Sequence, residues 1–511
     1  MALVKIAKNA VNAKLIDASP EIKSIVSRLL SYEVAGAEHS LLFKSGRWDG
    51  RSSFFKHRQG TFPAGFVNRV DSVLKKKGHR VQLIHKPLPE PLGIERAPID
   101  SFDYQPEYEY QPETVERLLT KGSMVAQLAT GGGKSRVCCM AVARIKRPTL
   151  FITTRGALMY QMRDHLQASF EYRAQQGETD LIGAQVGVIG DGEWYPKRFA
   201  TVAMVQTLAA RLKDPDPFSS KAQQKKQLII QEKTKELLGK FEFVVLEEAH
   251  EASSDSYFNI LKHCVNAHYR LALTATPFMK DNEEDNMRLM ACVGGVGIKV
   301  SEKQLIELGI LAKPYFKYLD TAKPDKLCKS TSWQRAYKIG ITENEHRNLA
   351  IVEESRKMVF HGLTVMILVQ HTKHGHTLRD LLNADGMKAI FIRGESSQVE
   401  RQRALKKLGE GDIDVLIGTN ILDVGVDVPS VGGIILAGGG KAEVALRQRI
   451  GRGLRKKKQG PNVAFIVDFT DSHNCHTRDH ATQRRWIVQN TEGFGENILA
   501  EDDEFNFALF E

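Results

Sequence analysis

The chain has 511 residues, of which 42% are hydrophobic, and a formal net charge of +11. This length suits about three domains with separate cores and favours a multidomain enzyme over a small binding module. No apolar run approaches the ~18 residues of a membrane span, and the first residues lack a signal-peptide core. Six cysteines without paired spacing argue against a zinc ribbon or a disulfide framework. We therefore expect a soluble cytoplasmic protein with reduced thiols.

The beginning of the chain carries most of the net positive charge. The first 100 residues contain 17 Lys or Arg and 9 Asp or Glu. This balance favours sequence-independent contacts with the phosphates of a polyanion. The aromatic residue Trp48 lies between two basic residues, Arg47 and Arg51. These three residues are our candidate nucleic-acid contacts. The alternative is that Trp48 and the phenylalanines after it form the core of a small domain. We expect a small basic α+β domain over residues 1–86.

A proline-rich stretch follows. Five prolines between residues 87 and 106 predict an extended or irregular linker over residues 87–110. A helical pattern then begins, with Gln111 near its start and a short strand separating it from the next motif. Taken alone, Gln111 is equally compatible with helix capping.

The next motif is glycine-rich and reads Leu128-Ala129-Thr130-Gly131-Gly132-Gly133-Lys134-Ser135. It follows a predicted buried strand and opens a predicted helix. Such a loop offers consecutive backbone N–H groups to phosphates, a Lys to the β- and γ-phosphates and a hydroxyl to magnesium. The strict pattern has glycine where Leu128 stands. The motif predicts an ATP and magnesium site at Thr130, Gly131, Gly132, Gly133, Lys134 and Ser135.

Two neighbouring carboxylates follow a later strand. Residues 243–246 are apolar, and Glu247 and Glu248 come directly after them. In open α/β sheets, ligands collect at the carboxyl ends of strands. One carboxylate can hold magnesium through water, while the other orients and deprotonates the attacking water.

Other segments with hydroxyl or amide side chains also end predicted strands. Each is short enough to be an ordinary exit from strand to loop. Residues 221–240 between them predict a charged helical insertion with a solvated face. The candidate residues in these segments are Thr153, Thr154, Gln206, Thr207, Thr274 and Thr276.

A second series of alternating strands and helices begins near Leu311 and predicts another parallel sheet. It ends in Gln448-Arg449-Ile450-Gly451-Arg452-Gly453-Leu454-Arg455. Two arginines three residues apart share one helical face and can stabilise charge on a γ-phosphate. The ATP site is therefore predicted to be split between two distant halves. The candidate residues of the second half are Thr419, Gly425, Asp427, Gln448, Arg452 and Arg455.

Taken in order, these segments over residues 111–470 resemble the superfamily-two helicases, which have two tandem RecA-like parallel-sheet domains. The resemblance implies that Gln111 reads adenine, Glu247 holds the metal and Glu248 is the base. It assigns coupling of hydrolysis to movement to His250, Thr274 and Thr276. It assigns contacts with the nucleic-acid backbone to Thr153, Thr154, Gln206, Thr207 and Thr419, and contacts with the nucleotide to Gly425 and Asp427.

Position 247 departs from that family, which has Asp where Glu247 stands. One additional methylene displaces a metal-binding carboxylate by more than ~1 Å, enough to slow catalysis. A weakened ATPase is therefore the competing interpretation of this site.

The stretch Gly46-Arg47-Trp48-Asp49-Gly50-Arg51, placed before such a core, is similar to the UvsW group of phage branched-DNA helicases. That resemblance implies an ATP-dependent DNA helicase that remodels forks, D-loops and Holliday junctions, with a front domain that binds double strands. We expect a monomer, located in the host cytoplasm if phage-encoded. Its expected parts are residues 1–86, 87–110, 111–310, 311–490 and 491–511.

Three other functions are compatible with parts of this pattern. A double-strand translocase of a restriction complex would share the core, but we find no nuclease-like grouping. An RNA helicase would share it too, although the front domain lacks an RNP-type aromatic motif. A DNA-binding scaffold with a weakened ATP site is the non-enzymatic alternative.

Two features near the C terminus have more than one interpretation. His473, Cys475, His476 and His480 cluster in sequence, but their spacing fits no common zinc pattern. Residues 501–511 alternate acidic and aromatic side chains. This tail is expected to dock on the basic core, mimic DNA or recruit a protein partner.

Overall fold

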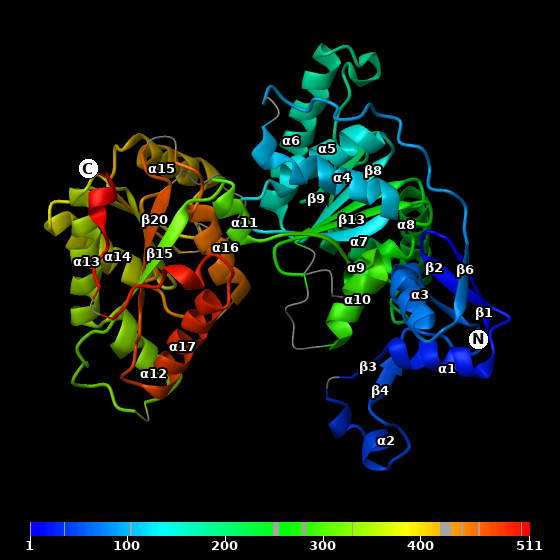
Figure 1. The fold of residues 1–511 in the computed structure, drawn as a ribbon, viewed down its shortest axis with the longest axis horizontal. Helices are drawn as coiled ribbons and strands as arrows, with labels where there is room; N and C mark the ends of the chain where they lie inside the picture. The colour runs from blue at the N-terminus through cyan, green and yellow to red at the C-terminus, as the bar shows by residue number, and fades with distance from the viewer. Residues whose placement is uncertain are drawn as a thin grey trace. The chain divides into compact units, whose positions relative to one another are not determined.

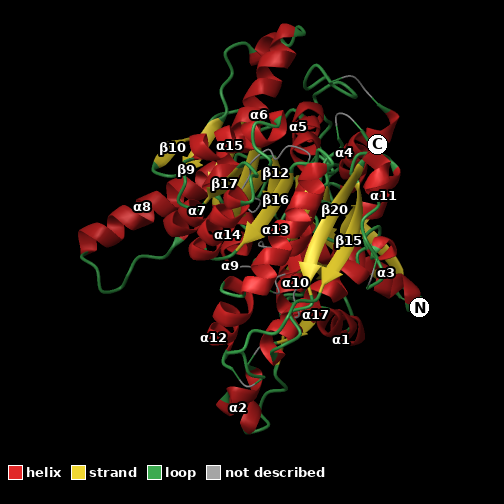
Figure 2. Cartoon of the chain, turned by 90° about the vertical axis from the view of Figure 1, so that its left-hand side faces the viewer, coloured by secondary structure: helices red, strands yellow, loops and turns green. Residues whose placement is uncertain are grey.

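The computed structural model describes most of the chain. The described residues are 2–34, 36–102, 105–248, 255–277, 283–329, 331–419, 431–440, 443–457, 460–501 and 503–510. The chain divides into two compact units, residues 1–128 with 133–299 and residues 129–132 with 300–511. Each unit contains a large, mainly parallel β-sheet flanked by helices (Figures 1 and 2). The expected α/β fold with two parallel sheets is confirmed, whereas the domain boundaries stay predictions.

The first unit begins with a small mixed sheet in the order β5-β2-β1-β6. Alternate residues of β1 and β2 are buried, so one face of this sheet packs on two helices. The core beneath it includes Met287 and Ala291 of a later helix, α10, so the small sheet shares apolar contacts with the rest of the unit. The elements are β1 Leu3–Lys8, β2 Asn12–Ile16, α1 Pro20–Leu29, β5 Thr61–Pro63, α3 Val67–Lys76 and β6 Arg80–Ile84.

A two-stranded antiparallel ribbon leaves this small sheet. Its strands are β3 Ser31–Glu33 and β4 Arg51–Ser53. Residues 36–50, which we call the arm, connect the two strands and contain the short helix α2 Leu41–Lys44. Figure 1 shows α2 projecting beyond the end of the ribbon, and α2 lies at the lower edge of Figure 2.

The proline-rich segment after β6 has no helix or strand in its described residues before Pro106. It nevertheless lies against the rest of the unit. The Gly93 N–H donates to the Arg144 carbonyl, and the Tyr269 hydroxyl donates to the Pro89 carbonyl. The expected irregular linker is therefore fixed along the surface of the first unit.

The large sheet of the first unit has the order β10-β9-β11-β8-β12-β13-β7-β14. The pairs from β9 to β7 are parallel, and β10 is antiparallel to β9. Its central strands are buried at nearly every residue, as expected when helices cover both faces. The strands are β7 Ser123–Leu128, β8 Thr149–Thr153, β9 Gly187–Gly190, β10 Glu193–Tyr195, β11 Ala200–Met204, β12 Phe243–Glu247, β13 Tyr269–Thr274 and β14 Val296–Val300.

Helices alternate with these strands. The charged insertion predicted over residues 221–240 is confirmed as a helix, α8, which begins with a capping box at Ser220 and Gln223. Figure 2 shows α8 extending away from the sheet. The helices of this part are α4 Tyr110–Lys121, α5 Lys134–Ile145, α6 Gly156–Gln175, α7 Val205–Leu212, α8 Lys221–Leu238, α9 Asp255–Leu261 and α10 Glu283–Val293.

The second unit has an all-parallel sheet in the order β15-β20-β19-β16-β18-β17. Its strands are β15 Lys313–Leu319, β16 Val365–Val369, β17 Ala389–Ile392, β18 Val415–Thr419, β19 Gly433–Ile435 and β20 Val463–Phe469. Its helices are α11 Glu302–Glu307, α12 Trp333–Tyr337, α13 Glu345–Phe360, α14 Thr372–Ala384, α15 Gln398–Glu410, α16 Glu443–Gly453 and α17 Cys475–Gln489.

The C-terminal tail packs on this second sheet. Phe505 is buried, with its ring centroid 4.6 Å from that of Phe465 in β20. Lys317 Nζ lies 2.5 Å from a carboxylate oxygen of Glu504. The tail therefore docks on its own unit, which is one of the three roles considered from the sequence. Recruitment of a protein partner stays a prediction.

The His and Cys side chains near the C terminus contact separate partners. His473 Nε2 lies 2.5 Å from the Thr321 carbonyl oxygen, and the His480 ring packs 4.2 Å from that of Trp333. Within the described ranges, no group of three or more His, Cys, Asp or Glu side chains is arranged to hold a metal ion. Over the same ranges, no helix combines the length and the apolar character of a membrane span.

Candidate functional site

The glycine-rich loop joins β7 to α5, and its backbone depends on glycine. Gly131 has φ +91° and Gly133 has φ +76°, values that residues with a Cβ rarely adopt. Helix α5 begins at Lys134, directly after Gly133. A helix N terminus has backbone N–H groups without helical partners and a partial positive charge, both of which favour phosphate. The expected strand, loop and helix context is confirmed.

Gln111 lies against this loop. The residue is in the first turn of α4 and only 3% exposed. A Cβ built at Gly133 would collide with Gln111 Nε2, so the amide lies where a larger residue would project. The neighbouring Tyr110 is buried too, which raises the pKa of its phenol to about 12. The structure thus places Gln111 beside the loop, while its contact with adenine stays a prediction.

The two carboxylates lie at the carboxyl end of β12. Glu247 is the last residue of the strand, and both Glu247 and Glu248 are buried. Glu248 has φ +47°, a strained left-handed conformation of the kind that concentrates at active sites. Burial raises the pKa of the Cys138 thiol in α5, and the nearby Cys139 and Glu247 raise it further. Glu247 is therefore close to the helix that follows the glycine-rich loop.

Thr274 is the last residue of β13, the strand between β7 and β12, and Thr276 lies two residues beyond it. The Thr276 N–H donates to Thr274 Oγ1 at 3.2 Å, and Gln127 Nε2 of β7 donates to the Ala275 carbonyl at 3.3 Å. Among the described residues, the buried Thr276 Oγ1 has no hydrogen-bond partner. Because β7, β13 and β12 are parallel neighbours, the loop, the threonines and the carboxylates share one edge of the sheet.

Two of the segments proposed to grip nucleic acid are brought together at the ends of β8 and β11. Gln206 Nε2 donates to the Thr154 carbonyl at 2.9 Å, across 52 positions in sequence. Gln206 is exposed, whereas Thr154 and Thr207 are half-buried. Thr153 is buried, and its hydroxyl accepts a hydrogen bond from the Arg155 N–H. Contacts of these residues with nucleic acid stay predictions.

The N-terminal candidates differ in their surroundings. Trp48 is half-buried and its ring N–H donates to the Arg51 carbonyl. The Arg51 guanidinium pairs with Glu33 at 3.0 Å and Glu283 at 3.3 Å. Arg47 is exposed. Trp48 and Arg51 therefore have structural contacts, as the alternative of a small-domain core predicted for Trp48, whereas no local pattern distinguished Arg51 from Arg47.

The second unit contributes Thr419 at the end of β18. Its Oγ1 accepts a hydrogen bond from the Gly394 N–H at 3.0 Å. Arg455 follows α16 and is half-buried, and burial lowers the pKa of its guanidinium. Arg447, which the sequence did not single out, pairs with Glu302 at 2.5 Å and links α16 to α11. His250, Gly425, Asp427 and the side chains of Gln448 and Arg452 lie outside the described residues.

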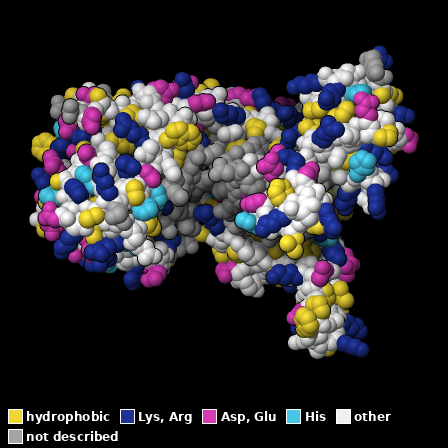
Figure 3. Space-filling view, turned by 90° about the horizontal axis from the view of Figure 1, so that it is seen from below, with side chains coloured by type: hydrophobic (Ala, Val, Ile, Leu, Met, Phe, Trp, Pro, Cys, Tyr) yellow, Lys and Arg dark blue, Asp and Glu magenta, His cyan; other side chains and the backbone are white. Residues whose placement is uncertain are grey.

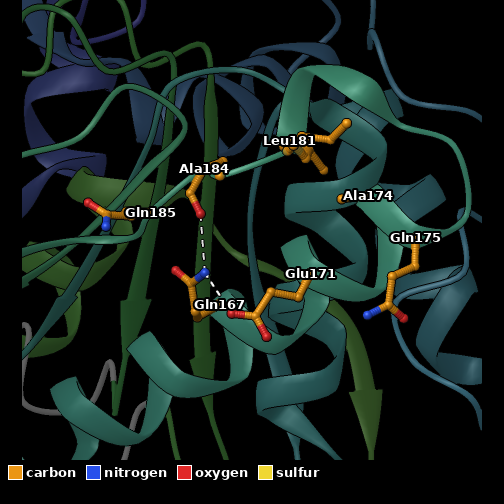
Figure 4. A pocket seen from close by; sticks show the side chains of 9 residues that line it. Gln167, Glu171, Ala174, Gln175, Leu181, Ala184 and Gln185 are labelled. Atoms are coloured by element: carbon orange, nitrogen blue, oxygen red, sulfur yellow. Dashed lines mark hydrogen bonds between the residues drawn. The ribbon is translucent and has the colours of Figure 1, made fainter.

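A cavity of about 450 Å³ lies elsewhere in the first unit, beside α6 (Figure 4). Gln167 donates to the Ala184 carbonyl at 3.1 Å and to Glu171 at 3.0 Å within it. None of the candidate residues lines this cavity, so it is separate from the sheet edge described above.

Comparison with known proteins defines the family. The model of the type III restriction enzyme res subunit matches residues 105–279, and that of the helicase conserved C-terminal domain matches residues 350–457. The chain is 22% identical over 504 residues to the ATP-dependent DNA helicase uvsW of Enterobacteria phage T4. That alignment covers 94% of this chain and 93% of the phage protein. The chain is a superfamily-two helicase that resembles UvsW.

Two other similarities are weaker. The helicase is 23% identical over 393 residues to the DNA 3'-5' translocase XPB2 of Sulfurisphaera tokodaii, over 70% of this chain and 81% of that protein. A solved fragment of an HsdR subunit of a type I restriction enzyme from Vibrio vulnificus YJ016 superposes with a TM-score of 0.51 at 18% identity. It covers 75% of this chain and 66% of that chain, and this likeness supports the fold alone.

Membership of the superfamily settles the class of reaction. The helicase is an enzyme that hydrolyses ATP. This result confirms the expected ATPase and removes the interpretation of a non-enzymatic scaffold. The roles of single residues, the DNA substrate and the small basic front domain stay predictions.

Proposed function

We propose that this helicase uses ATP hydrolysis to unwind or branch-migrate forked, D-loop and Holliday-junction DNA in recombination, repair or replication. The observation that carries the proposal is the common sheet edge. The glycine-rich loop, Gln111 and the two buried carboxylates lie at the ends of neighbouring parallel strands or against the loop there. Similarity to the phage DNA helicase over nearly the whole chain supports DNA as the substrate.

The residues at this edge fit a magnesium nucleotide. Because Gly133 has no Cβ, the Gln111 amide has room beside the loop, and the buried Thr276 hydroxyl lacks a partner among the described residues. Lys134 and the backbone of the loop would bind phosphates, and Ser135 and Glu247 would hold magnesium. The bound ion would neutralise charge on the phosphates.

Glu248 is assigned the role of general base. Its carboxylate would orient a water molecule and accept its proton during hydrolysis. The residue is buried at the strand end in a strained backbone conformation, which restricts the positions that the carboxylate can occupy. His250, Gly425, Asp427, Gln448, Arg452 and Arg455 keep the roles that the helicase resemblance implies.

Movement would be coupled to hydrolysis through the turn after β13. The Gln127 bond to the Ala275 carbonyl connects this turn to the strand that leads into the loop. The Thr154 and Gln206 pair lies at the ends of strands in the same sheet. A shift at the nucleotide could therefore reach the residues that contact a DNA backbone. Because such contacts are with phosphates, binding should be sequence-tolerant and weaken with salt.

The test is ATP hydrolysis and strand separation by the full chain on matched DNA substrates. We expect four-way and forked DNA to stimulate ATPase activity more than linear duplex of equal length, and to be separated only with ATP and magnesium. Failure of every DNA to stimulate hydrolysis would contradict the proposal.

A double-strand translocase of a restriction-type complex is the second candidate. The match of residues 105–279 to the type III restriction enzyme res subunit favours it. It predicts that long linear duplex is the best activator and that strands are not separated. The same substrate series therefore distinguishes the two functions.

A further inference from the structure

The tip of the arm exposes apolar side chains. Leu41 is 85% exposed and Leu42 is 56% exposed. Phe43, the next residue, is 40% exposed but its ring packs against the arm, since a Cβ built at Gly50 would lie 3.0 Å from that ring and 3.3 Å from Ala37. Leu41 and Leu42 are thus displayed while Phe43 anchors the helix that carries them.

Hydrogen bonds fix the tip in this form. Ser40 caps α2 by accepting from the Phe43 N–H. After the helix, the Arg47 N–H donates to the Leu42 carbonyl, and Gly46 adopts φ +70°. This turn closes the C-terminal end of α2. The exposure of the two leucines therefore belongs to a defined turn.

The base of the arm is fastened as well. The Val34 N–H donates to the Gly50 carbonyl at 2.9 Å. Beside it, Arg51 pairs with Glu33 and with Glu283 of α10, and the Trp48 ring N–H donates to the Arg51 carbonyl. These contacts connect the base of the arm to the first unit.

Basic side chains flank the apolar tip. Lys44 and Arg47 are exposed within six residues of Leu41. The acidic side chains of the arm are Glu38, which lies 3.5 Å from His39, and Asp49, which accepts from the Arg51 N–H. In Figure 1 α2 projects at the bottom of the first unit, and Figure 3, seen from below, shows hydrophobic, basic and acidic side chains interspersed over the surface.

We propose that the arm is a wedge for DNA branch points. Leu41 and Leu42 lie against the base-pair faces that a branch exposes, and Lys44 and Arg47 contact the adjoining phosphates. Proteins that kink or open DNA insert apolar side chains between base steps in this way. Uninterrupted duplex exposes no base-pair face along its length, so the wedge would favour branched DNA. The inference rests on the proposed function and names the part of the substrate that the arm recognises.

The test uses the full chain with Leu41→Asn and Leu42→Asn combined, a change confined to exposed side chains. We expect ATPase activity on linear duplex to stay within about twofold of wild type. Separation of four-way DNA should fall about tenfold, because apolar contacts with base faces are lost. The matched control is Leu349→Asn with Phe360→Asn, two exposed apolar positions on α13 at 58% and 84% exposure, which should leave both activities unchanged.

A second readout needs no ATP. With 2-aminopurine placed at the branch, wild type should raise the fluorescence on binding because the base is unstacked, and the double variant should not. Equal fluorescence and equal strand separation for wild type and the double variant would overturn the wedge. A wild-type dimer that becomes a monomer in the double variant, as measured by sedimentation, would also overturn it. If wild type raises the signal at the branch but never separates strands, the proposed function fails while the wedge stands.

Discussion

At the glycine-rich loop and at the arm, a side chain lies over a glycine with positive φ. The two regions differ in the kind of side chain that they bury or expose to solvent. At the loop, the Gln111 amide lies against Gly133 and is 3% exposed. At the arm, Phe43 covers Gly50, and the adjacent Leu41 is 85% exposed. A buried polar group and an exposed apolar patch carry information about function, whereas a single exposed leucine does not, so the arm is informative only because Leu41 and Leu42 are exposed together. Apolar side chains are usually buried and polar ones exposed. Each region departs from this rule at the place where a ligand is expected to bind.

The largest effect should come from the buried carboxylates. Glu248→Gln keeps the size of the side chain but removes its ability to accept a proton. We expect the ATPase rate to fall at least ~100-fold while nucleotide binding is retained. The measurement is steady-state ATPase with a fluorescent ATP analogue for binding. Hydrolysis within a few-fold of wild type would show that this buried carboxylate is not the base.

The next effect tests the glycine beneath Gln111. Gly133→Ala introduces a Cβ that displaces the Gln111 amide from the loop, so we expect a loss of about tenfold or more in ATPase activity. Gly386→Ala is the matched control, because Gly386 has φ +90° and no neighbouring atom within 4 Å of its Cβ position. Both variants carry the backbone strain of ~1 kcal/mol. Equal ATPase activities of the two variants would show that the glycine beneath Gln111 is not needed for hydrolysis.

A smaller effect separates two arginines of the arm region. Arg47 is exposed, and Arg47→Ala should lower the slope of log affinity against log salt by about one, as expected for one lost phosphate contact. Arg51→Ala breaks the pairs with Glu33 and Glu283, so it should reduce four-way DNA separation a few-fold without changing that slope. Binding titrations at several salt concentrations give the result. A reduced slope for Arg51→Ala would make it a direct DNA contact.

The smallest effect tests whether the burial of a polar side chain indicates by itself that the residue is functional. His374 is buried outside both regions, and burial, with Arg347 and His371 nearby, lowers its pKa to about 3. The unfolded chain, with a His pKa near ~6.5, binds the extra proton first, so stability is full above that pH and is lost as pH falls toward 3.

The loss for His374 should be about 2 kcal/mol between pH 7 and pH 5. His374→Gln has no such proton to bind and can keep a bond to Asn348, whose side chain lies 2.9 Å from the imidazole. Its melting temperature should therefore fall less on acidification, with ATPase activity at pH 7 unchanged. A parallel fall in both proteins would show that His374 does not set the acid response.

The loop could be predicted from the sequence because its chemistry fixes residue types. Phosphate binding requires glycine where φ is positive and a lysine at the helix start, and Gly133 and Lys134 meet both needs. The position of Glu247 and Glu248 at a strand end follows equally from the apolar run before them. These features depend on short stretches of chain.

The arm could not be predicted in the same way. The pattern of an aromatic residue among basic residues pointed to Trp48 and Arg51. Arg51, however, pairs with Glu283, a residue 232 positions away in sequence. No local pattern reveals such a partner. Leu41 and Leu42 look like ordinary core residues until their exposure is known. Residue type indicates chemistry, whereas exposure is set by the whole fold.

The central claim is that ATP hydrolysis at the glycine-rich loop powers strand separation of branched DNA. One measurement tests this claim most directly. Single-turnover separation of a synthetic four-way junction is compared for wild type and Lys134→Ala, with and without ATP. Wild type should separate the junction only with ATP, and Lys134→Ala should be slower by at least ~100-fold because it loses a charge at the phosphates. Equal rates for the two proteins, or no separation by wild type, would contradict the claim.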